Sequence, residues 1–289
     1  MGGVQFRPLK IAVLIPSRGR SELLRKNLAK MPWLLNHDTF IGVEHDEFTA
    51  DGYRWLQATP VRIILYNNKE GSVGIAREKL RLAATKEHYD YYVATDDNAR
   101  YNEHAVNALV QSTEAWRVHT GKMTLACGMH STAPHFDKNL ILRKETVGGW
   151  TTYPGINFIF HCMPHDWYAK YSYPGGCFAL EDRHMMLTAI DLGHSEFRVC
   201  MDAPYAKSRY QVGGQGDIKK RQWNCGRSIE QLAHDFPTYV GARGTFPLPW
   251  QFILKLRSGA VVDRLMGGAM RKGDALDVPV KKLRAKVRK

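Results

Sequence analysis

Three polar residues that could bind a metal-bound diphosphate stand shortly after an apolar segment. That segment is residues 89–94 (YDYYVA), and Asp96, Asp97 and Asn98 follow it. Carboxylate and amide oxygens are ligands that Mg²⁺ and Mn²⁺ prefer, and such cations commonly reach a protein together with substrate phosphates. Asp and Asn also favour ordinary turns. Taken alone, the triplet fits a cation site and a turn equally well.

A second pair of acids, Glu181 and Asp182, begins a segment of helical periodicity at residues 181–192. A carboxylate held in position can take the proton from an attacking hydroxyl group near neutral pH. On local grounds, however, acids in the first turn of a helix more commonly interact with the helix dipole. Both interpretations of the pair, a general base and a dipole contact, stay open at this point.

The elements that must position these residues alternate between strand and helix patterns over the first 130 residues. This alternation indicates an α/β fold with a mostly parallel sheet flanked by helices. The expected strands are residues 10–16, 39–43, 61–66, 89–94 and 123–127, and the expected helices are 73–85, 102–119 and one that begins at Ser21.

Polar residues follow the first, second and fourth of these expected strands. They are Ser17 and Arg18, then residues 44–46, then residues 96–98. In an open α/β sheet, ligands bind beyond the carboxyl ends of the strands. We therefore expect three separate polar segments to meet at one edge of the sheet.

The rest of the chain is less regular. Residues 128–176 are rich in Gly, Pro, His and aromatic residues, and we expect short strands and loops beside a site there. A strand is expected at 197–201 after the helix at 181–192, followed by a glycine-rich loop at 212–216 and a helix near 229–236.

Composition narrows the class of protein. The chain has 289 residues, 44% of them hydrophobic, which is enough for a sizeable core. No apolar run approaches the roughly 20 residues needed to cross a bilayer, and the N-terminus lacks the apolar stretch of a signal peptide, so we expect a cytoplasmic protein. The 5 cysteines form no C-x-x-C pair, which argues against a disulfide framework or a structural zinc site.

The positive charge is concentrated in the C-terminal part. The net charge is +13, and residues 207–289 hold 18 Lys and Arg against 6 Asp and Glu. A solvated basic surface is one explanation, but so uneven a distribution favours a polyanionic partner, nucleic acid before membrane. Lys219, Lys220, Arg221 and Trp223 combine phosphate-binding groups with an aromatic ring that could stack on a base.

The order and spacing of these motifs resemble the GT-A glycosyltransferases of the large inverting family 2. That family's first strand ends in a Pro-Ser/Thr-x-x-Arg-like turn, here IPSRGR at residues 15–20. Its third strand leads into an Asn-x-Gly…Ala-Arg helix start, here residues 68–77, and its fourth strand ends in an Asp-x-Asp-like motif, here residues 96–98. A Glu-Asp pair then opens a later helix. The resemblance covers about residues 8–205 and implies a Rossmann-like GT-A fold and transfer of a sugar from a UDP-sugar.

The resemblance also implies roles for individual residues. The donor nucleotide would contact Pro16, Ser17, Arg18, Glu44, Asp46, Arg77, Asp96 and Asp97. Within this set, Glu44 or Asp46 would accept from the uracil or ribose. Arg77 would counter the pyrophosphate, although a surface salt bridge explains an arginine at this position equally well.

The resemblance also implies which residues bind the metal ion and which residue is the general base. Mn²⁺ or Mg²⁺ would face Asp96 and Asn98, with Asp97 as the alternative, and Asn98 stands where the family usually has Asp. Asp182 matches the position of the general base, with Glu181 second.

The acceptor side resembles a narrower group, the bacteriophage glycosyltransferases that decorate 5-hydroxymethylpyrimidines in DNA. The shared features are a compact GT-A core, the Glu-Asp helix, a Gly-Gly loop and a basic C-terminal extension. This resemblance implies double-stranded DNA as the partner, a target base flipped out of the stack, and 5-hydroxymethylcytosine ahead of the uracil analogue. The acceptor contacts would be Tyr173, Gly175, Gly176, Lys219, Lys220, Arg221 and Trp223.

The corresponding layout has three parts. Residues 1–206 form a GT-A catalytic domain, with nucleotide-sugar binding at about 8–130 and the acceptor side at 131–206; residues 207–272 form a basic helical extension, and residues 273–289 a basic tail. Two alternatives remain: a glycosyltransferase acting on a surface glycan or a protein, and a nucleotide-binding module or nucleotidyltransferase, which can use the same acidic strand end.

Overall fold

The computed structural model describes ten stretches of the chain. They are residues 9–50, 52–68, 72–130, 144–154, 159–174, 180–192, 195–207, 218–243, 250–255 and 261–267. The glycine-rich loop at 212–216 and the basic tail at 273–289 lie outside them.

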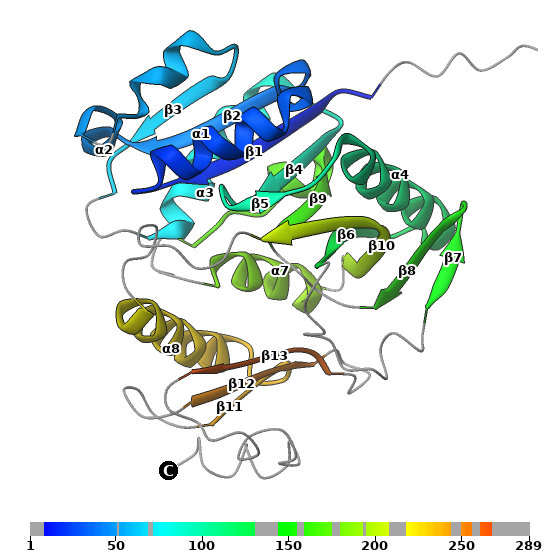
Figure 1. Cartoon of the computed structure of the whole chain (residues 1–289). Coiled ribbons are helices and arrows are strands. Elements are labelled where there is room, and N and C mark those ends of the chain that lie inside the picture. The colour runs from blue at the N-terminus through cyan, green and yellow to red at the C-terminus, as the bar shows by residue number, and fades with distance from the viewer. Residues whose placement is uncertain are drawn as a thin grey trace, which may run out of the picture.

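The described residues form one large mixed sheet with helices on both faces (Figure 1). The strand order is β3-β2-β1-β4-β9-β6-β10-β8-β7, and β5 pairs with β10. These strands are β1 Ile11–Ser17, β2 Asp38–Glu44, β3 Arg62–Tyr66, β4 Tyr91–Thr95, β5 Ala99–Arg100, β6 Met123–His130, β7 Glu145–Val147, β8 Trp150–Pro154, β9 Phe160–Pro164 and β10 Ser195–Lys207.

The half of the sheet that carries the predicted donor site is parallel. Strand β1 pairs in parallel with β2 on one side and with β4 on the other, and β2 pairs in parallel with β3. Strand β9 then enters antiparallel between β4 and β6. The prediction of a mostly parallel α/β sheet flanked by helices is confirmed.

The helices are α1 Ser21–Lys30, α2 His45–Ala50, α3 Val73–Ala84, α4 Glu103–Thr120, α6 His165–Lys170, α7 Glu181–Asp191 and α8 Ile218–Asp235, with short 3₁₀ turns at Pro32–Asn36, Tyr53–Ala58 and Thr85–Glu87. Local signals fix their ends. The side chain of Asn102 accepts a 2.8 Å hydrogen bond from the N–H of Ala105 at the start of α4, and Gly121, with φ 67°, ends that helix.

The core divides into two layers because side chains alternate across β1. Ala12 and Leu14 face a cluster shared with α3, α6, α7 and α8, whereas Val13 and Ile15 face a cluster shared with α1, α2 and α4. A central strand buried on both faces needs a continuous apolar sequence, and the β1 sequence provides one.

Three local predictions differ from the structure. The polar stretch after β2 forms the short helix α2, and the last predicted strand is extended to Ser195–Lys207, with an irregularity between Cys200 and Pro204. The C-terminal extension is not wholly helical: after α8, the strands β11 Val240–Arg243, β12 Trp250–Lys255 and β13 Val261–Gly267 form an antiparallel sheet. The aromatic and β-branched residues of this part favour strands. No helix in the described stretches is long and apolar enough to cross a membrane.

Candidate active site

The carboxyl ends of β1, β2 and β4 lie side by side, so the three predicted polar segments do meet at one edge of the sheet. The contact between the first and the last is direct. Ser17 Oγ donates a 2.8 Å hydrogen bond to Asp97 Oδ2, and the hydroxyl groups of Ser17 and Tyr53 lie 2.9 Å apart. Pro16 lies one residue earlier in β1, in register with Gly42 of β2.

Asp97 points into the protein. Its side chain is fully buried and pairs with Arg20, whose Nη2 lies 3.0 Å from Oδ1. The backbone carbonyl of Asp97 also accepts a 2.8 Å hydrogen bond from Asn27 of α1. This carboxylate therefore ties the end of β4 to β1 and to α1. Burial raises the pKa of the neighbouring Tyr53 to about 12, which keeps its hydroxyl group protonated.

Asp96 and Asn98 differ from Asp97 in their surroundings. The Asp96 side chain is 27% exposed, and its Oδ1 accepts a 3.0 Å hydrogen bond from Arg77 Nη2. Asn98 is buried, and its Oδ1 has no hydrogen-bond partner in the described part of the chain. An outward carboxylate beside an orphaned amide oxygen fits a divalent cation that a diphosphate brings with it.

The described residues do not form a metal site built wholly from protein ligands. In the stretches that the structure describes, no group of three or more His, Cys, Asp or Glu side chains could hold a metal ion. Mg²⁺-type sites often use only one or two carboxylates and complete their shell with phosphates and water. The donor set at Asp96 and Asn98 therefore fits a cation carried by a substrate.

Glu44 and its neighbours organise the turn after β2. Glu44 is buried, and its Oε2 accepts hydrogen bonds of 3.0 and 3.2 Å from the N–H groups of Asp46 and Glu47, which leaves Oε1 without a donor among the described residues. The Asp46 side chain is 74% exposed. Glu47, which the sequence did not single out, holds the turn after β1 through Arg18 Nε at 3.1 Å and the N–H of Gly19 at 2.8 Å.

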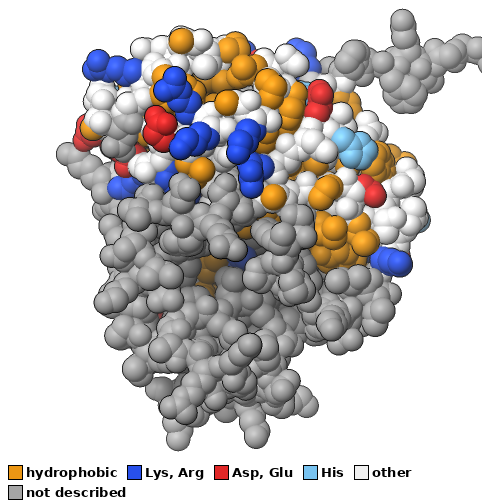
Figure 2. Space-filling view, in the orientation of Figure 1, with side chains coloured by type: hydrophobic (Ala, Val, Ile, Leu, Met, Phe, Trp, Pro, Cys, Tyr) orange, Lys and Arg blue, Asp and Glu red, His pale blue; other side chains and the backbone are white. Residues whose placement is uncertain are grey.

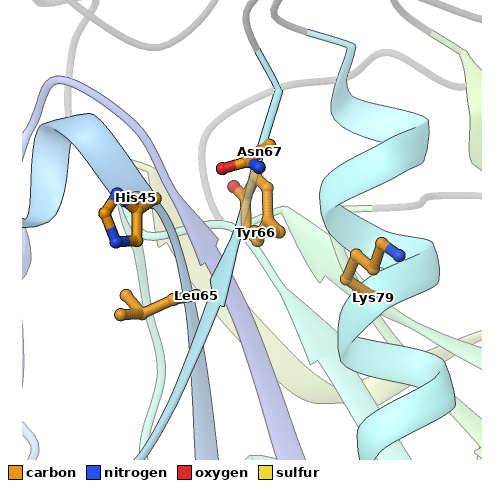
Figure 3. Close-up of a pocket in the computed structure, with 5 residues that line it drawn as sticks. All are labelled: His45, Leu65, Tyr66, Asn67 and Lys79. Atoms are coloured by element: carbon orange, nitrogen blue, oxygen red, sulfur yellow. The ribbon is translucent and has the colours of Figure 1, made fainter.

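An open hollow of about 420 Å³ adjoins this turn, beyond the ends of β2 and β3 (Figure 3). Its lining residues are His45, Leu65, Tyr66, Asn67 and Lys79. Figure 3 shows His45 and Leu65 on one side of the end of β3 and Lys79 of α3 on the other. Asn67 directly follows a strand, so the rule that selected Ser17 and Asp96 could have selected it as well.

Glu181 and Asp182 lie at the start of α7 and are buried despite their charge, with 3% and 6% of each residue exposed. Glu181 Oε1 accepts a 2.7 Å hydrogen bond from Arg77 Nε, so the same guanidinium contacts Asp96 and Glu181. Asp182 Oδ1 accepts a 2.8 Å hydrogen bond from the N–H of Arg183, and no donor among the described residues reaches Oδ2. Asp182 Oδ1 also lies 3.9 Å from Arg183 Nη1, so each of the two acids faces a different arginine.

The environment of this pair favours protonation. Burial raises the pKa of Glu181 to about 7, and the adjacent Asp182 carboxylate contributes through charge repulsion. Burial also raises the pKa of Asp182, against the opposing effects of Arg183 and Arg77. Burial thus raises the pKa values of both carboxyl groups, and a general base that works near neutral pH needs a shift in this direction.

Among the predicted acceptor residues, the structure describes the side chain of Tyr173. Tyr173 is buried, and its N–H donates a 2.9 Å hydrogen bond to Glu78, so its ring is not exposed for stacking. Gly175 and Gly176 lie outside the described residues. The residues Lys219, Lys220, Arg221 and Trp223 fall in the first turns of α8, and their side chains are not described.

Helix α8 is nevertheless anchored beside α7. Ile229, Leu232 and Phe236 belong to the same core cluster as Met185 of α7. His184 Nε2 of α7 lies 3.0 Å from Asp235 Oδ2 at the end of α8. The basic C-terminal part therefore begins next to the helix that carries Glu181 and Asp182.

Comparison with solved structures agrees with this fold. Glucosyl-3-phosphoglycerate synthase from Mycobacterium tuberculosis, solved in complex with Mn²⁺, UDP and phosphoglyceric acid, matches with a TM-score of 0.54 and 11% identity over 83% of this chain and 88% of its own. The S. aureus TarS 1–349 fragment matches with a TM-score of 0.50 and 12% identity over 78% of this chain. The fold is that of the GT-A glycosyltransferases.

These matches concern architecture alone, because sequence identity is low. The chain spans 65% of the TarS 1–349 fragment and 39% of the longer TarS structure. No protein-family model matches the sequence. No curated protein matches it either.

Proposed function

We propose that this chain is a glycosyltransferase that moves a sugar from a UDP-sugar to a hydroxyl acceptor. The observation that carries this proposal is the double contact of Arg77. Through it, the outward carboxylate at the end of β4 and the buried acid pair at the start of α7 face one guanidinium group. A GT-A fold with a donor edge and a candidate base this close together suits single-step sugar transfer.

The reaction follows from the placement of the acids. Asp182 takes the proton of the acceptor hydroxyl group as that oxygen bonds to the anomeric carbon, the bond from that carbon to the diphosphate breaks, and UDP leaves with the electron pair. Asp96 and Asn98 would hold a divalent cation, Mn²⁺ or Mg²⁺, which neutralises charge on the leaving diphosphate when bound. Ser17 and Glu44 line the edge where the nucleotide would lie.

For the acceptor, the proposal is the 5-hydroxymethyl group of a modified pyrimidine in phage DNA, with cytosine favoured over uracil. The support is the charge of residues 207–289 and the position of α8 beside α7. Figure 2 shows Lys and Arg side chains gathered in the region of α1, whose exposed residues include Arg25, Lys26 and Lys30. Basic groups of this kind attract the DNA backbone in a salt-dependent way. The reaction would take place in the cytoplasm of an infected host cell.

The deciding experiment incubates the protein with UDP-sugars, Mn²⁺ and either hydroxymethylated or plain DNA, then digests the DNA to nucleosides for mass spectrometry. A hexose or N-acetylhexosamine on hydroxymethylated DNA alone supports the DNA acceptor. If UDP is released with glycan or protein acceptors but with none of the DNA acceptors, the glycosyltransferase proposal stands and the DNA acceptor is rejected. An absence of UDP release with every acceptor rejects both.

The base assignment has a matched control. Asp182→Asn should lower kcat by at least about 10²-fold, which is the lower range for loss of general base catalysis. Asp166 is the second residue of α6 as Asp182 is of α7, so Asp166→Asn removes a comparable helix-dipole contact and should leave kcat unchanged. Deletion of residues 273–289 should weaken DNA binding and make its salt dependence shallower.

A further inference from the structure

Arg77 is the buried centre of an ion-pair network between the two sides of the site. Its side chain is 5% exposed, as against 4% for Glu181 and 27% for Asp96. Its Nε donates a 2.7 Å hydrogen bond to Glu181, and its Nη2 donates a 3.0 Å hydrogen bond to Asp96. Its Nη1 is buried without a hydrogen-bond partner in the described part of the chain. Burial lowers the pKa of Arg77, but the carboxylates of Glu181 and Asp96 outweigh it and the net shift is upward.

Two neighbours of Arg77 on α3, Glu78 and Arg81, bind the chain segment that precedes α7. Glu78 accepts the N–H of Tyr173, and Arg81 Nη1 donates to the carbonyls of Tyr168 and Ala169, each at 3.2 Å. Arg81 and Glu78 also pair with each other at 2.7 Å. Helix α3 therefore holds both α7 and the chain segment that precedes it.

The resemblance to family 2 implies a contact between Arg77 and the donor pyrophosphate, and the structure adds two contacts of Arg77 with carboxylates. Two of its three guanidinium nitrogens already form ion pairs, one with a carboxylate after β4 and one with a carboxylate of α7, and the side chain is almost wholly buried. A planar guanidinium can hold two carboxylates in fixed directions, whereas a lysine ammonium cannot reproduce that geometry.

We propose, on the basis of the glycosyltransferase function above, that Arg77 is a positioning residue that fixes the acid pair of α7 against the donor edge by holding Glu181 and Asp96 together. Arg77 contacts Glu181 directly, whereas Asp182, the proposed base, is held by the N–H of Arg183, so Arg77 acts on the base through its neighbour in the helix. The distance between the base and the donor carbon then depends on one side chain of α3. Small errors in such a distance reduce the rate of the chemical step more than they reduce substrate binding.

The kinetic test uses Arg77→Lys. Loss of positioning should lower kcat by roughly 30-fold or more while the donor KM stays within about 3-fold, because the diphosphate contact is not what is lost. Arg62 is the control, since it also joins two carboxylates, Asp38 and Glu87, but at the opposite end of the strands and on the surface. Arg62→Lys should leave both constants unchanged. A donor KM that rises with kcat unchanged, or no change at all, overturns the proposal.

A second measurement needs no activity and so separates this proposal from the proposed function. Arg77→Met leaves Glu181 buried without its partner and should lower the melting temperature by roughly 5 to 10 °C. Adding Glu181→Gln removes the stranded charge, so the double variant should melt higher than Arg77→Met alone. If the decreases in melting temperature of the two single variants simply add in the double variant, Arg77 and Glu181 do not act together. If the cycle is non-additive but no UDP is released with any acceptor, the network stands and the glycosyltransferase proposal fails.

Discussion

Asp96 and Asp97 are adjacent and chemically identical, yet the structure predicts opposite consequences when each is neutralised. Asp97→Asn removes a fully buried charge that pairs with Arg20 at 3.0 Å and accepts from Ser17 at 2.8 Å. Breaking a buried ion pair commonly costs about 3 to 5 kcal/mol. The Arg20 side chain is 21% exposed and regains some hydration, so the lower end, about 3 kcal/mol, is expected.

Asp96→Asn is the matched comparison. The Asp96 side chain is 27% exposed, and Arg77 keeps its 2.7 Å contact with Glu181 after the change. A partly exposed pair contributes about 1 kcal/mol or less, so the two variants should differ by about 2 kcal/mol. With a urea m-value of about 2 kcal/mol/M, this difference is about 1 M in the unfolding midpoint.

The assay is urea unfolding of both variants, followed by tryptophan fluorescence and circular dichroism at constant pH. The expected order of midpoints is wild type, then Asp96→Asn slightly lower, then Asp97→Asn much lower. Equal midpoints, or a larger loss for Asp96→Asn, would refute the assignment of Asp97 as the inward anchor. Titration with UDP and Mn²⁺ should show weakened binding in Asp96→Asn.

Three further predictions concern pH, metal and packing. The ratio kcat/KM should rise with pH through an apparent pKa above the ordinary range of an aspartate, because burial raises the pKa of Asp182 and the base must lose its proton. A profile measured from about pH 4 to 9 that is flat or falls contradicts this. Chelation with EDTA should stop UDP release, and Mn²⁺ should restore it; activity that persists in EDTA argues against a cation at Asp96. In Gly128→Ala the new Cβ would clash with Phe160 Cδ1 and lie 2.9 Å from the Ala203 carbonyl oxygen. Thermal unfolding should therefore show a loss of about 2 kcal/mol in stability, and an unchanged melting temperature would mean that the strands can separate without penalty.

The parallel half of the fold was predictable because its signals are local. The continuous apolar run of β1 and the turn residues after each strand mark boundaries within one or two residues of the observed ones. Strand β9 was not predictable, since it enters antiparallel between β4 and β6 from a stretch without periodicity. The length of β10 also depends on partners far along the chain, first β6 and then β5.

The sequence predicts where the site lies in the sheet but not which side chains contact one another. The strand-end rule brought Ser17 and Asp97 to one edge, but nothing in the sequence distinguishes the inward aspartate from the outward one. The pairing of Arg77 with Glu181 joins residues 104 positions apart, and only the packing of α3 near α7 creates it. The same holds for Tyr173, whose aromatic ring suits stacking by type but is used in the core.

The structure also bears on the two interpretations that the sequence left open for Glu181 and Asp182. An acid needs no burial to complement a helix dipole, and its charge is stabilised most easily in water. Here both are buried, both pKa values are raised, and the preceding Leu180 adopts a left-handed conformation with φ 60°. Burying two like charges next to a strained residue lowers stability, and such arrangements are characteristic of functional sites. The burial of the pair therefore favours a chemical role over a dipole contact, as the proposed function requires.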